Sequence, residues 1–138
     1  MARPVDDYLE QLWRKLGTNV VVNGITALTD RGISVVGEPM VATLATRVLE
    51  EAWAVARAEG ADLGPDQIAR LVETLGKAPD GSSTSMHADR RAGRPTEWDA
   101  LYGAVTRYGA RHGIATPIHE TLAALISAGD GASTVGTP

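Results

Sequence analysis

The chain contains no cysteine and no long apolar run. Without cysteine it can form no disulfide framework, thiolate nucleophile or zinc-thiolate site, and a reducing cytoplasm is the compartment that we expect. No apolar segment approaches the ~20 residues that a membrane-spanning helix needs. The N-terminus also lacks the basic and then apolar layout of a signal peptide. These absences predict a cytoplasmic protein without a membrane partner.

Several catalytic and binding motifs are missing as well. There is no G-x-G-x-x-G after a strand, no P-loop and no H-E-x-x-H, so no motif here predicts nucleotide or zinc binding. No Ser-His-Asp arrangement is evident around the serines of residues 82–85, which argues against a serine hydrolase. We interpret the scattered histidines as surface or capping residues rather than metal ligands. They are His87, His112 and His119.

The composition is that of one soluble globular domain. The 138 residues are 43% hydrophobic and 22% charged, which is enough to build a core. The net charge of -4 and the pI near 5.3 argue against nucleic acid or anionic lipid as a partner, because phosphate binding needs clustered Lys and Arg. The one basic cluster is Arg90, Arg91 and Arg94, flanked by Asp89 and Glu97. We interpret it as a solvated surface turn.

Apolar residues at helical spacing predict about six helices and no strand. They run from 7 to 29, from Pro39 to about 60, from Pro65 to about 76, from about 84 to 91, from Thr96 to about 112, and from Pro117 towards the C-terminus. Proline suits the first turn of a helix, and Thr96 is a good N-cap. We therefore predict an all-α fold, with one domain over residues 1–129 and a Gly, Ser and Thr rich flexible tail over 130–138.

A polar stripe crosses the first predicted helix. Lys15, Asn19 and Asn23 follow one another at steps of four residues, which advance the helix face by only about 40° each. Burying an ammonium and two amides is unfavourable by several kcal/mol unless each finds a partner. The stripe therefore predicts either a closed internal network or a ligand, and we favour the ligand.

Lysine is itself scarce here, since only Lys15 and Lys77 accompany eleven arginines. An ammonium can lose its proton and a guanidinium in practice cannot, so a lysine kept against this bias is a candidate proton donor.

A second polar motif lies between Ser85 and Asp99, and together with the stripe it makes the chain resemble a known family. The chain resembles the C-terminal helical domain of ketopantoate reductases (2-dehydropantoate 2-reductases), a fold similar to the C-terminal domain of 6-phosphogluconate dehydrogenase. The resemblance covers about residues 8 to 127. Its motifs are Trp13-Arg14-Lys15-Leu16, Asn19, Asn23, Thr26-Ala27-Leu28, Ser85-Met86, Asp89, Gly93-Arg94, Thr96-Glu97, Asp99, Gly103, His112-Gly113-Ile114 and Pro117.

The resemblance implies an oxidoreductase that reduces a 2-keto acid to a 2-hydroxy acid, as in pantothenate biosynthesis. An N-terminal Rossmann domain would bind NADPH, and the helical domain would supply most of the keto-acid pocket. Lys15 would be the catalytic acid, with Glu97 as the carboxylate that orients Lys15 or the substrate hydroxyl. A positioned ammonium supplies both charge stabilisation and a proton to a developing alkoxide. The implied substrate-binding residues are Asn19, Asn23, Ser85 and Asp89.

The chain also departs from the family pattern. No segment corresponds to the nucleotide domain, so we expect no cofactor on this chain alone and no activity without a separate Rossmann domain. Tyr102 stands where family members often carry asparagine, and a further asparagine is replaced in the Gly32-Ile33-Ser34 region.

Three readings of the residues therefore stay open: the substrate half of a reductase, a binding module for a small carboxylate or a protein, and a structural bundle with a closed Lys15, Asn19 and Glu97 network. Apolar surface left by an absent nucleotide domain further predicts a homodimer.

Overall fold

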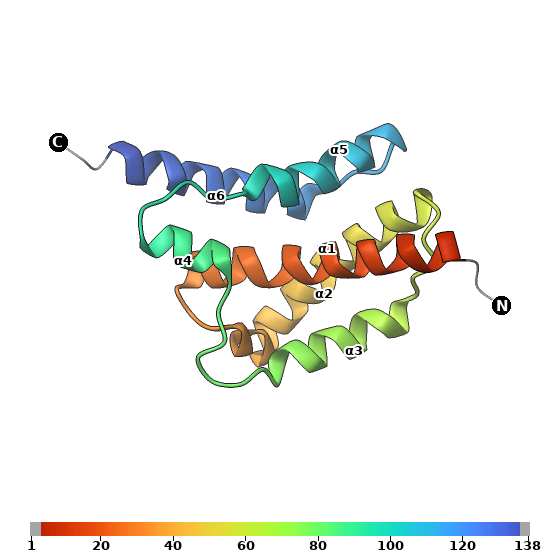
Figure 1. Cartoon of the computed structure of the whole chain (residues 1–138), viewed down its shortest axis with the longest axis horizontal. Helices are drawn as coiled ribbons and strands as arrows, with labels where there is room; N and C mark the ends of the chain where they lie inside the picture. The colour runs from red at the N-terminus through yellow and green to blue at the C-terminus, as the bar shows by residue number, and fades with distance from the viewer. Residues whose placement is uncertain (1–3, 136–138) are drawn as a thin grey trace.

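The computed structural model describes residues 4–135, and these form an all-α fold (Figure 1). No strand occurs among them, so the prediction of an all-α fold of about six helices is confirmed. The α-helices are α1 (Pro4–Thr29), α2 (Pro39–Ala58), α3 (Pro65–Gly76), α4 (Ser85–Arg91), α5 (Ala104–Arg111) and α6 (Pro117–Val135). Two short elements complete the order: a 3₁₀ helix η1 (Ile33–Gly37) and a π-helix η2 (Asp99–Gly103).

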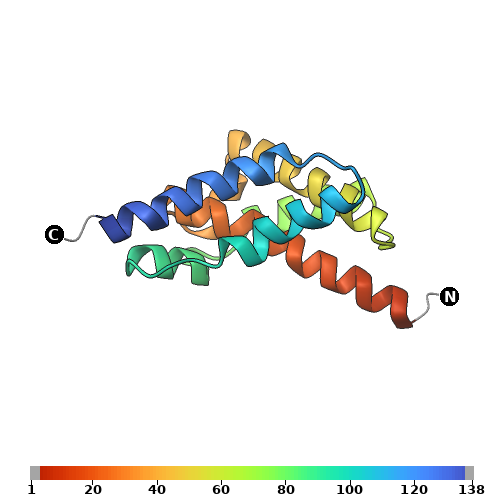
Figure 2. The same ribbon diagram turned by 90° about the horizontal axis from the view of Figure 1, so that it is seen from above.

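The helix α1 lies across the middle of the molecule. Figure 1 shows α3 on one side of it and α5 with α6 on the other, while α2 crosses behind. The helix α4 packs against α1, and α2 contacts both α3 and α6. Seen from above, α1 and α6 extend towards opposite ends of the molecule (Figure 2). The first half of α1 is exposed on one side, at residues 8, 11, 12, 14 and 15, whereas residues 20–27 are buried.

Four of the helices begin with residues that favour a helix start. Pro39, Pro65 and Pro117 open α2, α3 and α6, as predicted, because the fixed φ of proline suits the first turn. Thr84 caps α4, where its side chain accepts a hydrogen bond from the backbone N–H of His87 at 3.1 Å.

The core lies between α1, α2 and α6. Gly17 on α1 lets the indole of Trp53 pack directly on the backbone, because a Cβ at this position would lie 2.3 Å from Trp53 Cζ3. Full burial of each large apolar side chain contributes about 1.5–3 kcal/mol. The largest buried apolar residues include Val20, Val21, Val48, Leu49, Trp53, Val55, Tyr102 and Ile126.

The predicted N-cap at Thr96 is wrong. The Thr96 hydroxyl and backbone N–H both donate to Asp130 Oδ2 of α6, at 2.8 and 3.0 Å. The following helix begins with the π-helix η2 instead of an α-helical turn capped by threonine. A tertiary contact to α6 has taken the place of the local cap.

The segment predicted as a flexible tail, residues 130–138, lies partly within the described residues. There α6 continues to Val135, and it includes the Asp130 that binds Thr96. Residues 136–138 lie outside the described part. No helix within residues 4–135 combines the length and the apolar character that crossing a membrane requires.

Candidate functional site

The polar stripe of α1 runs from the surface into the protein. Lys15 is exposed, Asn19 is half-buried, and Asn23 is only 7% exposed. The side-chain amide of Asn23 donates through Nδ2 to the backbone oxygen of Asn19 at 2.9 Å. The three side chains therefore share a face, as predicted, but differ in their access to solvent.

Four of the six predicted site residues line one small crevice. Asn23 from α1, Ser85 and Asp89 from α4, and Glu97 from the segment before η2 surround a volume of about 20 Å³, closed by Met86 and Leu101. A space of this size holds about one water molecule. The helix α1 and the distant segment from Ser85 to Glu97 thus bring two carboxylates, a hydroxyl and an amide together.

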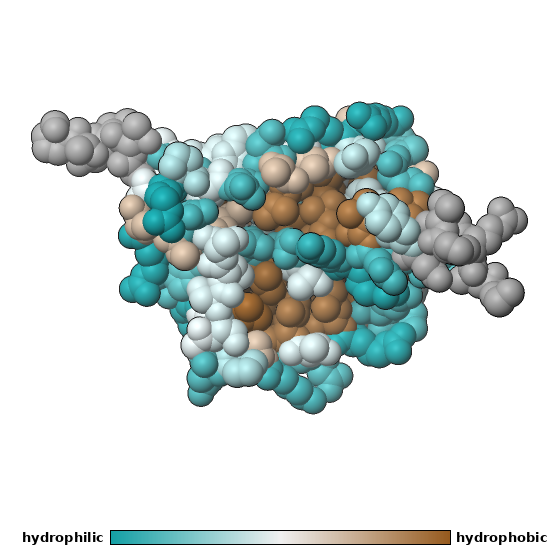
Figure 3. Space-filling view, in the orientation of Figure 1, coloured by the Kyte–Doolittle hydropathy of each residue, from teal (hydrophilic) through white to brown (hydrophobic). Residues whose placement is uncertain are grey.

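The other two predicted residues line a larger groove. Lys15 and Asn19 stand beside a hollow of about 420 Å³. Its remaining lining is mostly apolar: Leu9, Leu12, Trp13, Leu16, Glu59 and Tyr108. Figure 3 shows hydrophobic surface on both sides of a hydrophilic strip that follows α1. The Lys15 ammonium therefore stands at the edge of an apolar groove.

We predicted that Lys15 and Glu97 meet in one hollow, and the described residues do not show this. Lys15 lines the groove and Glu97 lines the crevice, and no ion pair joins them within residues 4–135. The reason is the length of the stripe, because eight residues of α-helix span about 12 Å. The two hollows are nevertheless neighbours, since Asn19 and Asn23 are one turn apart and bonded to each other. The closed Lys15, Asn19 and Glu97 network of the structural reading is likewise not formed there.

Asp89 is held by the arginine cluster. Arg94 donates from Nε to Asp89 Oδ1 at 3.0 Å and from its backbone N–H to Asp89 O at 2.8 Å. Arg91 pairs with Asp30 at 3.2 Å, and Arg90 donates to the backbone oxygen of Ile126 at 3.2 Å. Each arginine of the cluster therefore has a partner within the protein, and Arg94 fixes one wall of the crevice.

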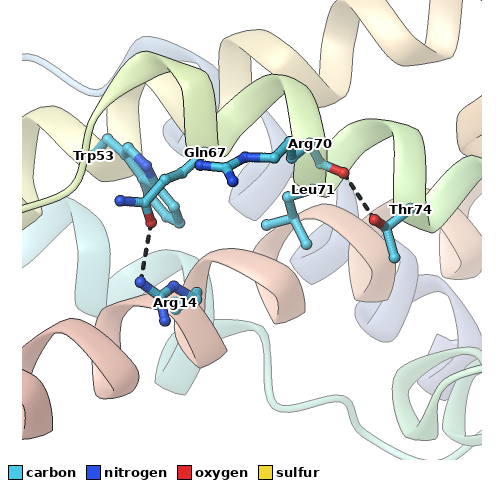
Figure 4. A pocket seen from close by; sticks show the side chains of 6 residues that line it. All are labelled: Arg14, Trp53, Gln67, Arg70, Leu71 and Thr74. Carbon is cyan, nitrogen blue, oxygen red and sulfur yellow. Dashed lines mark hydrogen bonds between the residues drawn. The ribbon is translucent and has the colours of Figure 1, made fainter.

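A further hollow on the other flank of α1 contains none of the predicted site residues. It has a volume of about 350 Å³ and lies between α1 and α3 (Figure 4). Arg14 donates from Nη2 to Gln67 Oε1 across it at 3.1 Å. Trp53 and Leu71 supply its apolar lining.

The interpretation of the histidines as surface or capping residues is wrong for two of them. His119 is fully buried and His87 is 7% exposed. The Nδ1 atom of His119 lies 2.8 Å from Glu51 Oε1, and burial, opposed by Glu51, lowers the pKa of this imidazole. No three potential metal-ligating side chains of His, Asp or Glu come together in the described part of the chain.

The structure also contains a Ser-His-Asp chain that the sequence did not reveal. Ser83 Oγ lies 2.7 Å from His87 Nδ1, and His87 Nε2 lies 2.7 Å from Asp30 Oδ1. The hydrogen bond from His87, helped by the charge of Arg91, lowers the pKa of Asp30. Asp30 directly follows α1 and is far from Ser83 in sequence, so spacing alone could not show the contact. Ser83 lines none of the hollows described above, and the chain ties α4 to the end of α1.

Tyr102 lies near the site, and the sequence did not lead us to predict that it contributes to it. It is fully buried, and its hydroxyl contacts the α1 backbone at Val20 and Gly24, which directly follow Asn19 and Asn23. Two signals pointed to it: a tyrosine at a position where the family often has asparagine, and Gly24 within an apolar helix. A glycine in a helix allows such a close approach.

Comparison with known proteins places these residues in a family context. A family model described as the C-terminal domain of ketopantoate reductase PanE/ApbA matches residues 7–130. The 2-dehydropantoate 2-reductase of Mycobacterium tuberculosis is 41% identical over 122 residues, which are 88% of this chain and 41% of that protein. The enzyme of the same name from Caulobacter vibrioides is 38% identical over 124 residues, covering 90% of this chain and 42% of its own length.

Solved structures give the same result for the fold. A dimeric ketopantoate reductase from Staphylococcus aureus matches with a TM-score of 0.83 and 26% identity, over 91% of this chain and 44% of the other. A D-mandelate dehydrogenase in complex with NADH and anilino(oxo)acetate matches with a TM-score of 0.83 and 25% identity, over 91% of this chain and 53% of the other. The chain thus spans about two fifths of the length of the curated relatives it matches.

Proposed function

Because the chain belongs to the ketopantoate reductase family, whose C-terminal domain it matches, we propose that it is the substrate-binding domain of an NADPH-dependent reductase. This enzyme would reduce a 2-keto acid such as ketopantoate to the 2-hydroxy acid. The observation that carries the proposal is the crevice that gathers Asn23, Ser85, Asp89 and Glu97, which lies one helical turn from Asn19 and two turns from Lys15 along α1.

Lys15 is the proton donor in this proposal. Its ammonium is exposed at the rim of an apolar groove, where a ketone oxygen can approach it. A charged donor stabilises the developing alkoxide and then delivers its proton to the oxygen. A primary amine suits this role, since a guanidinium does not release its proton at neutral pH.

The crevice residues hold and orient the keto acid. The amide of Asn23 is anchored on Asn19, so it presents a fixed polar group to the crevice. The hydroxyl of Ser85, at the first position of α4, can donate to a substrate oxygen. Glu97 can accept from a substrate hydroxyl, while Asp89 is held by Arg94 and stiffens the wall.

The size of the crevice supports a site that a second domain completes. Pockets that enclose small ligands have volumes of about 300–1,000 Å³. The crevice offers about 20 Å³, so it can receive only one functional group of the acid. Residues 4–135 contain no strand and no Gly-rich phosphate loop, so in this proposal NADPH binds to another domain. This chain would therefore contribute the acid and the substrate contacts, and a Rossmann domain would contribute the nucleotide site.

Self-association is a further part of the proposal. Tyr8, Leu12, Met40 and Leu125 are large apolar residues that are 49–88% exposed. Tyr8 and Leu12 lie one turn apart on α1, and a contiguous exposed apolar patch favours burial against another protein surface. The matched enzyme from Staphylococcus aureus is described as dimeric. Light scattering of the purified chain should give the mass of a homodimer, and a monomeric mass at micromolar concentration would contradict this.

A hybrid enzyme tests the proposed reaction. The nucleotide domain of the M. tuberculosis relative is joined upstream of this chain, and NADPH oxidation with ketopantoate is followed by absorbance. Lys15→Ala should lower kcat by a factor of about 10²–10⁴, the usual contribution of a general acid. Lys77→Ala is the matched control, because Lys77 is the other lysine, lies exposed just after α3 and pairs with Glu73 at 2.9 Å.

The outcomes are distinct. A hybrid that oxidises NADPH with ketopantoate, loses activity in Lys15→Ala and keeps it in Lys77→Ala supports the proposal. A folded hybrid that reduces no branched 2-keto acid contradicts the reductase function. Equal effects of the two lysine substitutions contradict the role of Lys15. Calorimetric binding of ketopantoate by an inactive hybrid would instead support a binding module.

A further inference from the structure

The hydroxyl of Tyr102 bridges two backbone groups of α1. It donates to the backbone oxygen of Val20 at 2.6 Å and accepts from the backbone N–H of Gly24 at 2.7 Å. An uninterrupted α-helix joins these same two groups directly, since they are four residues apart. A side chain that inserts into this ladder bends the helix at that point. The phenol is fully buried and uses its hydroxyl both as donor and as acceptor.

Gly24 and Tyr102, the two residues that meet at the bridge, are both suited to this contact. A Cβ at Gly24 would lie 2.3 Å from the Tyr102 hydroxyl oxygen, so only glycine leaves room for the contact. Tyr102 is presented by the π-helix η2, and π turns re-aim side chains relative to an α-helix and are frequent at functional sites. Burial raises the pKa of Tyr102, so the hydroxyl keeps its proton and remains a donor.

The bridge lies directly beside the proposed keto-acid site. Asn19 and Asn23 immediately precede the two bridged residues, and Asn23 in turn donates to the oxygen of Asn19. Leu101, the neighbour of Tyr102 in η2, lines the crevice together with Glu97. One side chain thus links the backbone under both asparagines to the segment that carries the carboxylate.

We infer that Tyr102 is a positioning residue for the proposed keto-acid site. Its hydroxyl fixes the turn of α1 between Val20 and Gly24, and this sets the direction in which Asn23 meets the crevice relative to Lys15. The expected effect on catalysis rests on the proposed function. The effect of the bridge on the position of Asn23 does not depend on that function. Tyr102 does not touch the substrate in this account and acts through the α1 backbone.

The test has one readout for the bridge and one for catalysis. In the ¹⁵N-labelled 138-residue chain, Tyr102→Phe removes only the hydroxyl, and the side-chain amide resonances of Asn23 should shift while the fold is kept. In the hybrid enzyme, kcat/KM for ketopantoate should fall about tenfold or more, as expected for a misplaced substrate contact. Val48→Ala, which also perturbs the buried core but on α2, is the control and should leave both readouts unchanged.

A second variant keeps the test decisive if Tyr102→Phe does not fold. Gly24→Ala disrupts the bridge from the α1 side, because the added methyl group would displace the Tyr102 hydroxyl. Gly24→Ala alone should shift the Asn23 resonances and lower kcat/KM. Where Tyr102→Phe folds, the loss of kcat/KM in the double variant should not exceed that in the worse single variant, since both remove one shared interaction. Additive losses would count against a common bridge.

The outcomes separate the bridge from the proposed reaction. Unshifted Asn23 resonances, or a kcat/KM within about twofold of the parent hybrid, overturn the positioning role. If the parent hybrid is inactive, the proposed function is contradicted. The shift of the Asn23 resonances alone then tests whether Tyr102 positions Asn23.

Discussion

The half-buried carboxylate of Glu51 stabilises the start of α6, and its removal should destabilise the protein markedly. Glu51 accepts three hydrogen bonds from α6: from the backbone N–H of Ile118 at 2.9 Å, from that of His119 at 3.0 Å, and from His119 Nδ1 at 2.8 Å. The two backbone donors are among the N–H groups that a helix start leaves without partners. A carboxylate there also suits the helix dipole.

The magnitude of the loss in Glu51→Ala follows from these contacts. Loss of an N-terminal cap removes about 1–2 kcal/mol, and an unpaired buried imidazole N–H adds about 1–2 kcal/mol. We expect the free energy of unfolding to fall by about 3 kcal/mol. With a urea m-value of about 2 kcal/mol per molar, the midpoint should move down by about 1.5 M at constant m.

Urea unfolding followed by tryptophan fluorescence and circular dichroism measures this shift. Glu50→Ala is the matched control, because Glu50 precedes Glu51 on α2 but is exposed, and its loss should change stability by less than about 0.5 kcal/mol. If the two variants unfold at the same urea concentration, the tie between α2 and α6 does not stabilise the protein as argued.

Two other predictions concern stability. Since the pKa of His119 is lowered from its ordinary value of 6.5, the unfolded chain binds a proton that the folded chain does not, so stability should be complete above pH 6.5 and decline below it. Urea unfolding at several pH values checks this, and an equally steep decline in His119→Gln would contradict the assignment. Gly17→Ala should destabilise by about 1–3 kcal/mol despite the better helix propensity of alanine, because the methyl group would lie 2.3 Å from Trp53 Cζ3. Thermal melts compare it with Gly131→Ala on α6, where no atom lies within 4 Å of the added Cβ, and a higher melting temperature for Gly17→Ala would refute the packing argument.

Much of the helical architecture could be read from the chain itself. Proline at 39, 65 and 117 and glycine after the helices mark most element boundaries, because these residues restrict or permit particular backbone angles locally. The boundary that failed was the one at Thr96, whose hydroxyl binds Asp130 of α6 in place of its own helix. Local capping rules could not foresee a competing partner 34 residues away.

The candidate site could likewise be predicted only in part from the sequence. Spacing of four residues placed Lys15, Asn19 and Asn23 on one face of α1, and this follows from helix geometry alone. It could not tell how deep each side chain lies, nor that Glu97 reaches the level of Asn23 and not that of Lys15. Those facts depend on how α4 and η2 pack across α1.

By itself, the sequence determined the fold class, the shared face of the polar stripe and the family to which the two motifs belong, since each depends on local geometry or on residue identity at fixed spacing. Only the tertiary structure decided that the predicted residues divide between a crevice and a groove, that His119 is buried against Glu51, and that Tyr102 enters the hydrogen-bond ladder of α1. These are contacts between segments distant in the chain, and packing sets them.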